Sequence, residues 1–131
     1  MTHKIDIRIY YEDTDAGGIV YNANYLKFME RARTEWLRTK GLESGHFMRQ
    51  HNMTFVVARI EIKYKRPAYL DDILTAEAHV LEMKGSRIYM RQNITRGEET
   101  VAEAQCDLAL LDMQTGRGAK IPQDTLDLLA D

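Results

Sequence analysis

Polar and hydrophobic residues alternate with a period of two in five segments of the chain, a pattern typical of half-buried β-strands. The positions that share one face of these segments are Ile5, Ile7 and Ile9; Ile60, Ile62 and Tyr64; Leu74, Ala76, Ala78 and Val80; Ile88, Met90, Gln92 and Ile94; and Ala102, Ala104, Cys106, Leu108 and Leu110. Mostly charged or polar residues stand between them. The pattern therefore predicts a sheet that is covered on one face and at least partly wet on the other.

Short connections join the last three of these segments. Residues 84–86 (Lys-Gly-Ser) separate the third segment from the fourth, and residues 96–99 (Arg-Gly-Glu-Glu) separate the fourth from the fifth. Glycine-containing connections of this length join antiparallel neighbours in a hairpin. Pro67 and the aspartates at 71 and 72 bracket a further turn before the third segment.

The period changes to 3.6 residues at about Asn22, which predicts one long helix over residues 22–40. Its apolar face is expected to comprise Tyr25, Leu26, Met29, Ala32, Arg33, Trp36 and Leu37. Asn22 or Asn24 is suited to cap the start of this helix, and Gly41 is suited to end it in a left-handed conformation. A short helix is expected to follow around Ser44–His51.

The pattern predicts an α+β fold in which one antiparallel sheet curls around one long helix. A chain of 131 residues has room for one domain, which we take to span residues 1–131. Because this helix is the only predicted element long enough to cover the apolar face of the sheet, it is expected to lie against that face.

Composition and charge exclude several classes of function. The chain has 18 basic and 20 acidic residues, and a net charge of −2 gives no electrostatic footprint for duplex nucleic acid. One cysteine allows neither an internal disulfide nor a cysteine-based zinc site. Apolar runs such as residues 55–58 are too short to span a membrane, and the first fifteen residues contain no apolar signal segment. We therefore expect a cytoplasmic protein.

Common catalytic groups are poorly placed in this sequence. Ser86 falls in a predicted hairpin turn and Ser44 at a predicted helix start, so neither is expected to act as a nucleophile. Cys106 lies in the middle of a strand on its apolar face, where a buried thiol is expected. The four histidines have no metal-binding spacing, and no glycine-rich phosphate loop is present.

The segment 11–25 is unusual because it combines acidic residues with paired glycines ahead of the predicted helix. Gly17 and Gly18 permit backbone conformations closed to other residues. Free N–H groups at the helix start near Asn22 could bind a developing oxyanion, and a carboxylate at Asp15 facing them would suit hydrolysis of an acyl group. Two alternatives remain, namely an acidic loop that caps local amides and a metal site formed by Asp13 and Asp15.

This segment resembles a known family. Residues 13–25 (DTDAGGIVYNANY), followed by residues 28–37 (FMERARTEWL), are similar to the hotdog-fold thioesterases of the 4-hydroxybenzoyl-CoA type, and in particular to the acyl-CoA thioesterases found with the bacterial Tol–Pal system. The resemblance extends through residues 64–68, 70–72 and 112–116. It implies a sheet of about five strands wrapped around a central helix, and hydrolysis of acyl thioesters.

The resemblance also implies roles for individual residues. The second acid of the motif, Asp15, would be the catalytic carboxylate, acting either as nucleophile or as general base. Backbone N–H groups around Tyr21 and Asn22 would polarise the thioester carbonyl, and the turn at Gly17 and Gly18 would permit this approach. The residues assigned to the phosphates of CoA are Lys84 and Arg87, with Arg59 as a further candidate. Neither a metal nor a separate cofactor is expected, since CoA is part of the substrate.

One departure from the family concerns Asn22, because the related enzymes carry histidine at this position. An asparagine side chain can form hydrogen bonds but cannot transfer protons near neutral pH. Two alternatives to hydrolysis therefore stay open. One is a non-catalytic protein that binds acyl-CoA or acyl-carrier protein, and the other is a hydratase or dehydratase with the same fold.

The resemblance and the exposed sheet edges together predict a homo-oligomer, as a dimer or as a dimer of dimers that forms a homotetramer. Each active site would be shared between chains, with Asp15 facing the neighbour's strand near residues 55–60. Arg59, Lys63 and Arg66 from that neighbour could supply charge to CoA. The substrate is expected to be acyl-CoA or acyl-carrier protein.

Overall fold

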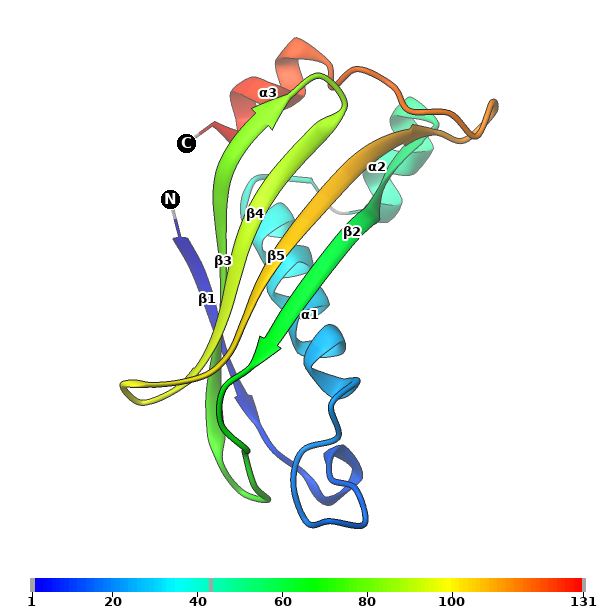
Figure 1. The fold of residues 1–131 in the computed structure, drawn as a ribbon. Coiled ribbons are helices and arrows are strands. Elements are labelled where there is room, and N and C mark those ends of the chain that lie inside the picture. The colour runs from blue at the N-terminus through cyan, green and yellow to red at the C-terminus, as the bar shows by residue number, and fades with distance from the viewer. Residues whose placement is uncertain (1, 43, 131) are drawn as a thin grey trace.

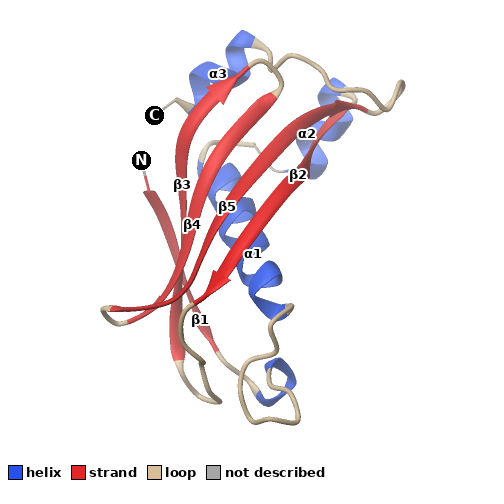
Figure 2. Ribbon diagram, viewed as in Figure 1, coloured by secondary structure: helices blue, strands red, loops and turns tan. Residues whose placement is uncertain are grey.

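The computed structural model describes residues 2–42 and 44–130, which form one five-stranded antiparallel sheet and three α-helices (Figures 1 and 2). The strand order is β1-β3-β4-β5-β2. In chain order the elements are β1 (Thr2–Arg8), the 3-10 helix η1 (Tyr11–Asp13), α1 (Asn24–Thr39), α2 (Ser44–His51), β2 (Met53–Tyr64), β3 (Ile73–Lys84), β4 (Arg87–Arg96), β5 (Glu99–Asp112) and α3 (Gln123–Leu129).

The predicted hairpins are confirmed. Strand β3 pairs with β4, and β4 pairs with β5, both in antiparallel register. Gly85 and Gly97 sit in the two connections with positive φ angles of 64° and 61°, which a glycine adopts without strain. The expected turn between β2 and β3 is also present, at residues 65–72.

Helix α1 lies across one face of the curved sheet (Figure 1), and its apolar side chains form the core with the strands. Trp36, Phe28 and Met29 are almost fully buried there. The expectation for Leu26 is wrong, because this side chain is 40% exposed and Phe28 occupies the sheet-facing position instead. Arg33, which was placed on the apolar face, is indeed buried and donates a hydrogen bond to the Gln92 amide oxygen at 2.9 Å.

The start of α1 differs from the sequence-based expectation. The helix begins at Asn24, its N-cap residue is Ala23, and no side chain caps it. Asn24 instead donates from its side-chain nitrogen to the Asp13 carboxylate at 2.9 Å. The expected end is confirmed, since Gly41 follows the helix with a φ of 77°.

The alternating pattern does not predict two parts of the fold, the first half of β2 and helix α3. Strand β2 begins at Met53, although residues 53–59 show no clean alternation of burial, and its register against β5 shifts between Val57 and Arg59. The C-terminal helix α3 was not expected. It buries Thr125 and Leu129 against the hairpin end of the molecule.

The strands of the sheet run between two opposite ends of the molecule. The β3–β4 hairpin lies at the end where β2 begins, because Arg87 pairs with Ala109 and Ala109 pairs with Val56. The loop between β1 and α1 lies at the opposite end, where β2 finishes (Figure 1). The unusual acidic segment therefore projects beyond one end of the strands rather than from the face of the sheet.

Candidate active site

The loop between β1 and α1 is anchored by Asp13. One oxygen of its carboxylate accepts the Tyr10 backbone N–H at 2.8 Å and the other accepts the Asn24 amide at 2.9 Å. Its backbone carbonyl accepts the Tyr21 N–H at 2.9 Å. Asp13 thus joins the entry of the loop to the start of α1, and both of its carboxylate oxygens already have protein partners.

Asp15 lies on the exposed part of the same loop, within a narrow turn. Its backbone N–H donates to the Ile19 carbonyl at 2.9 Å, and its carbonyl accepts the Gly18 N–H at 3.0 Å. One carboxylate oxygen accepts the Gly17 N–H at 2.8 Å, which orients the side chain. The other oxygen has no hydrogen-bond partner among the described residues, so it is available to a substrate or to water.

The structure shows why both of these positions in the turn carry glycine. Gly18 has a φ of 82°, in the left-handed region that favours glycine. A Cβ atom on Gly17 would lie 3.2 Å from the carboxylate oxygen of Asp15. Gly18 therefore permits the turn, whereas Gly17 leaves space for the carboxylate.

The backbone N–H groups at the start of α1 divide into used and unused donors. Tyr21 donates to the Asp13 carbonyl and Asn24 donates to the Tyr21 carbonyl, each at 2.9 Å. The expectation that the Tyr21 N–H polarises a substrate is thereby corrected, since that donor is occupied. Within the described part of the chain no partner is found for the N–H groups of Asn22 and Ala23.

A groove of about 400 Å³ opens beside these free donors. Its lining residues are Ile19, Val20, Asn22, Tyr25, Tyr64, Lys65, Arg66 and Pro67. Asp15, Gly17, Gly18 and Tyr21 belong to the same loop but do not line this groove. Of the two residues with unused N–H groups, Asn22 therefore lines the groove, whereas Ala23 and Asp15 do not.

Two tyrosines that the sequence analysis placed on the apolar faces of a helix and a strand, and not in the site, help to line the groove. The rings of Tyr25 and Tyr64 meet edge to face with centroids 5.6 Å apart. Burial, offset in part by the nearby Arg96 cation, raises the pKa of Tyr25 to about 12, so this phenol is neutral. The Tyr64 hydroxyl donates to the backbone carbonyl of Asn22 at 3.0 Å.

The turn between β2 and β3 is hydrogen-bonded to the β1–α1 loop. Val20 donates its N–H to the Ala68 carbonyl at 2.9 Å. Arg96 fixes that turn through hydrogen bonds to the Pro67 carbonyl at 3.0 Å and to the Asp72 carboxylate at 2.8 Å. Burial opposes ionisation of Asp72, but hydrogen bonds from the Tyr69 N–H and Arg96 outweigh it and hold the pKa of that carboxyl below its ordinary value.

The basic residues expected to bind the phosphates of CoA lie away from Asp15 in a single chain. Lys84 and Arg87 form the β3–β4 hairpin, at the end of the sheet opposite to the β1–α1 loop (Figure 1). Arg59 projects from β2 and pairs with Glu61 at 2.8 Å. One chain therefore does not bring these three cations to Asp15.

The cysteine and serine residues that the sequence offers as possible nucleophiles lie outside the β1–α1 loop. Cys106 is buried as expected, and burial raises the pKa of its thiol. Ser86 lies at the β3–β4 hairpin, and the side chain of Ser44 lies outside what the structure describes. Among residues 2–42 and 44–130 no three side chains from His, Cys, Asp and Glu come close enough to hold a metal ion. No helix in these ranges is long and apolar enough to cross a membrane.

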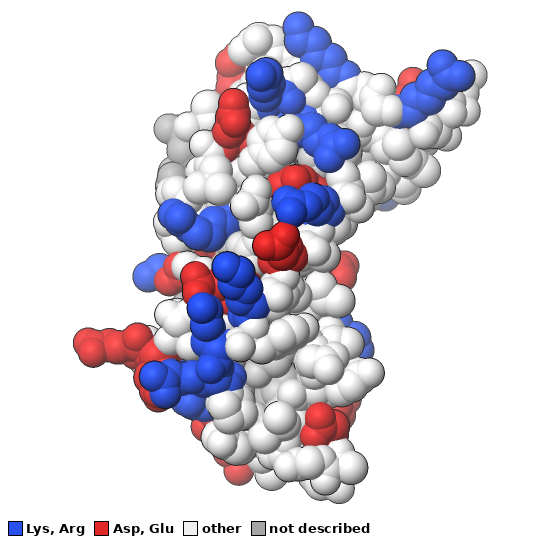
Figure 3. All heavy atoms as spheres, viewed as in Figure 1, with Lys and Arg blue, Asp and Glu red and all other residues white. Residues whose placement is uncertain are grey.

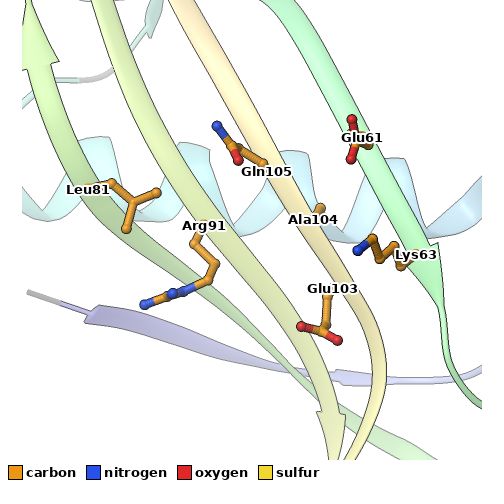
Figure 4. Close-up of a pocket in the computed structure, with 7 residues that line it drawn as sticks. All are labelled: Glu61, Lys63, Leu81, Arg91, Glu103, Ala104 and Gln105. Carbon is orange, nitrogen blue, oxygen red and sulfur yellow. The ribbon is translucent and has the colours of Figure 1, made fainter.

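A second hollow lies on the face of the sheet that points away from α1 (Figure 4). Its lining residues are Glu61, Lys63, Leu81, Arg91, Glu103, Ala104 and Gln105. Figure 3 shows Lys and Arg side chains interspersed with Asp and Glu over this face, whereas the lower end, where the β1–α1 loop lies, shows red Asp and Glu patches among white atoms in the same view. The charges of this hollow are of both signs, and none of its lining residues belongs to the β1–α1 loop.

Comparison with known proteins adds to this geometry. The family model described as "Thioesterase-like superfamily" matches residues 10–129, nearly the whole chain. The chain belongs to the thioesterase-like superfamily. Among its relatives in this superfamily, the acyl-CoA thioesterase YbgC of Haemophilus influenzae is 40% identical over 118 residues, which cover 90% of this chain and 87% of that protein. The long-chain acyl-CoA thioesterase FadM of Escherichia coli is 36% identical over 88% of this chain and 86% of its own.

Solved structures of other proteins share the fold. A probable thioesterase from Bartonella henselae aligns with a TM-score of 0.88 and 34% identity, covering 93% of this chain and all of that one. A 1,4-dihydroxy-2-naphthoyl-CoA thioesterase from Synechocystis aligns with a TM-score of 0.91 over the whole of this chain and 97% of its own, at 21% identity. These likenesses confirm the hotdog α+β fold expected from the sequence.

Proposed function

We propose that this protein is an acyl-CoA thioesterase, which hydrolyses an acyl thioester to a carboxylic acid and free CoA. The observation that carries the proposal is the loop itself, which holds both a carboxylate with one free oxygen and two unpartnered N–H groups at the start of α1. Relatives that bear the names acyl-CoA thioesterase and acyl-CoA thioester hydrolase support the same substrate class. The groove beside Asn22 offers room for part of the substrate.

The Asp15 carboxylate supplies the nucleophilic chemistry in this proposal, by one of two routes. It attacks the thioester carbonyl and expels the CoA thiolate, and water then cleaves the resulting mixed anhydride. Alternatively it removes a proton from the attacking water, and the thiolate leaves from the tetrahedral intermediate. Both routes need the ionised carboxylate and give the same acid and thiol.

The negative charge that develops on the thioester oxygen is stabilised by the N–H groups of Asn22 and Ala23. Fixed backbone donors at a helix start suit this role because they need no rearrangement as the charge appears. The side chain of Asn22 cannot act as an acid or base, so the proposal assigns no proton transfer to it. Gly17 and Gly18 keep the approach to Asp15 open.

We further propose that two chains pair through β2. This strand is an edge of the described sheet, twelve residues long, and its outward backbone groups are suited to pair with a second copy. Antiparallel pairing about a two-fold axis would bring the start of the partner's β2 beside the end of β2 in the first chain. The partner's β3–β4 hairpin would then lie at the same end as Asp15.

This pairing offers a role for the cations that lie far from Asp15 in one chain. The partner's β4 would be three strands away from β2, or about 14 Å at the usual strand spacing of about 4.8 Å. The partner's Lys84 and the partner's Arg87 could then reach the phosphates of a CoA bound at Asp15. The partner's Arg59 lies nearer the seam as a further candidate. The partner's Lys63 and the partner's Arg66 lie at and beyond the end of the partner's β2, which this pairing places away from Asp15.

Further parts of the proposal concern the cellular setting. We propose a cytoplasmic enzyme that works as a dimer or as a dimer of dimers, with acyl-carrier protein as the alternative thioester donor. The motif similarity to thioesterases found with the Tol–Pal system supports a related setting for this chain.

The test is the release of free thiol from a panel of acyl-CoAs, followed with a thiol-reactive dye. We expect Asp15→Asn to lower kcat by about 10²-fold or more, because it removes the reacting carboxylate. Asparagine can still accept the Gly17 N–H, so the melting temperature should stay close to that of the unmodified protein. EDTA should leave the rate unchanged. Wild-type turnover by Asp15→Asn, or loss of activity on chelation with recovery on adding Mg²⁺ or Mn²⁺, would contradict the mechanism.

A further inference from the structure

Tyr64 makes an unusual contact with the start of α1. It is the last residue of β2, and its hydroxyl donates a hydrogen bond of 3.0 Å to the backbone carbonyl of Asn22. Its ring packs edge to face on Tyr25 at a centroid distance of 5.6 Å, and Tyr25 is itself buried. The phenol is thus held against the catalytic loop by packing as well as by its hydrogen bond.

The contact acts on a peptide group whose other end is unused. The carbonyl of Asn22 and the N–H of Ala23 belong to one planar peptide unit and point in opposite directions. A hydrogen bond to the oxygen therefore fixes the direction of the Ala23 N–H and increases its polarity as a donor. That N–H has no partner among the described residues.

The neighbouring peptide group is fixed in a different way. The carbonyl of Tyr21 accepts the backbone N–H of Asn24 at 2.9 Å, and the N–H at the other end of this peptide is that of Asn22. In each of these two peptide units the N–H group is unused and the carbonyl accepts a hydrogen bond. Of the two, only the peptide between Asn22 and Ala23 accepts this hydrogen bond from a side chain, so only this bond can be removed by a side-chain mutation.

We propose that Tyr64 is a positioning residue for the oxyanion hole, which holds and polarises the Asn22–Ala23 peptide through its hydroxyl group. This inference rests on the proposed thioesterase function. The Tyr64 hydroxyl transfers no proton and forms no bond to the substrate in this role. It acts through the Ala23 N–H, which meets the thioester oxygen.

The role predicts a specific kinetic signature. Negative charge on the thioester oxygen is greatest in the transition state, so a weaker Ala23 donor mainly raises the barrier to reaction. Substrate binding in the ground state depends little on it. Loss of the hydroxyl should therefore lower kcat and leave KM nearly unchanged.

The kinetic test compares two tyrosine-to-phenylalanine variants. Tyr64→Phe removes the hydroxyl and keeps the ring, and we expect kcat to fall about tenfold with KM within about twofold, as for loss of one supporting hydrogen bond. Tyr69→Phe is the matched control, because Tyr69 is 47% exposed against 51% for Tyr64 and its hydroxyl has no hydrogen bond among the described residues. The control should retain the wild-type kcat, and both variants should keep the wild-type melting temperature.

A second measurement observes the peptide directly, without substrate. Asn22 is the only asparagine followed by alanine in the sequence, so protein labelled with ¹³C-carbonyl asparagine and ¹⁵N-alanine gives one amide–carbonyl correlation by NMR. We expect Tyr64→Phe to shift both the Asn22 carbonyl carbon and the Ala23 amide proton upfield. The spectrum of Tyr69→Phe should match that of the unmodified protein.

The outcomes distinguish this inference from the function on which it rests. If the unmodified protein releases thiol and Tyr64→Phe keeps its kcat, or if the correlation does not move, the role of Tyr64 is wrong while the thioesterase proposal stands. If the unmodified protein releases thiol from no acyl-CoA, the proposed function is wrong and the inference fails with it. An equal fall in activity for both variants would also overturn the specific role of Tyr64.

Discussion

At the scale of single residues, the two glycines beside Asp15 have separable roles. Gly18 has a φ of 82° with no atom near the position of a Cβ, so a side chain there would be strained but not crowded. Gly17 has an ordinary backbone conformation, but a Cβ on it would lie 3.2 Å from the Asp15 carboxylate. Gly18 therefore affects the stability of the turn, whereas Gly17 affects the position of the Asp15 carboxylate.

We predict that alanine at these two positions has different effects. Gly18→Ala should destabilise the protein by about 1 kcal/mol, because alanine is strained at positive φ. Gly17→Ala should displace Asp15 by a few tenths of an ångström and lower kcat severalfold, with a smaller change in stability. Urea unfolding and thiol-release kinetics on both variants measure the two effects. Equal losses of stability with unchanged kcat for Gly17→Ala would contradict the assignment.

Sequence reasoning identified most of the candidate loop, but not its hydrogen bonds. The resemblance located Asp15, Gly17 and Gly18 because their spacing is a motif. It could not show that Tyr21 donates to the Asp13 carbonyl, since that bond depends on how the loop closes. Tyr64 is 42 residues from Asn22 along the chain, and only the three-dimensional fold brings its hydroxyl to that carbonyl.

At the scale of secondary-structure elements, the sequence predicts the strands in which buried and exposed residues alternate strictly. Strands β3, β4 and β5 lie inside the sheet with one apolar face, and their period-two pattern was plain in the sequence. The first half of β2 lies at a sheet edge, where residues 53–56 are half-buried on both faces and residues 57–59 are exposed, so residues 53–59 carry no such pattern. Helix α3 is only seven residues long, too short for its periodicity to stand out.

The β2–β3 turn leads to a prediction on pH. The pKa of Asp72 is held below its ordinary value of 3.8 in the folded protein, so the folded state binds its proton less readily than the unfolded state. The resulting stabilisation is present above pH 3.8 and is lost as the pH falls through the lower, folded-state value. Asp72→Asn should therefore destabilise the protein by about 1 kcal/mol at neutral pH and weaken the decline in stability below pH 4.

Urea unfolding between pH 7 and pH 2.5 measures this effect. Asp71→Asn is the matched control, because the Asp71 side chain has no hydrogen bond among the described residues and asparagine tolerates its positive φ of 71°. The control should follow the wild-type curve. Parallel curves for the wild type and Asp72→Asn below pH 4 would show that the contact between Arg96 and Asp72 does not contribute to acid stability.

At the scale of the whole molecule, one chain leaves two features incomplete. The twelve-residue edge strand β2 has no partner on its outer side in the described sheet, and Val57 on this strand is 45% exposed. Two of the cations expected to bind CoA, Lys84 and Arg87, lie at the end of the sheet opposite to Asp15. Antiparallel pairing of two β2 strands would address both features, because it covers the edge and brings the partner's hairpin to the end that carries Asp15.

We predict that the active protein is at least a dimer and that its seam includes Val57. Val57→Lys should lower the dimer affinity, because a two-fold axis near residues 55–60 would bring the two lysines close together in a partly dry interface. Leu81→Lys is the control, since Leu81 is similarly exposed, at 48%, but lies on inner strand β3. In sedimentation equilibrium at micromolar concentration, wild type and Leu81→Lys should remain dimeric or larger, and Val57→Lys should shift toward 15 kDa with a parallel loss of turnover. A wild-type protein that is active as a 15 kDa monomer would exclude both the shared site and the reach of the partner's Lys84 toward CoA.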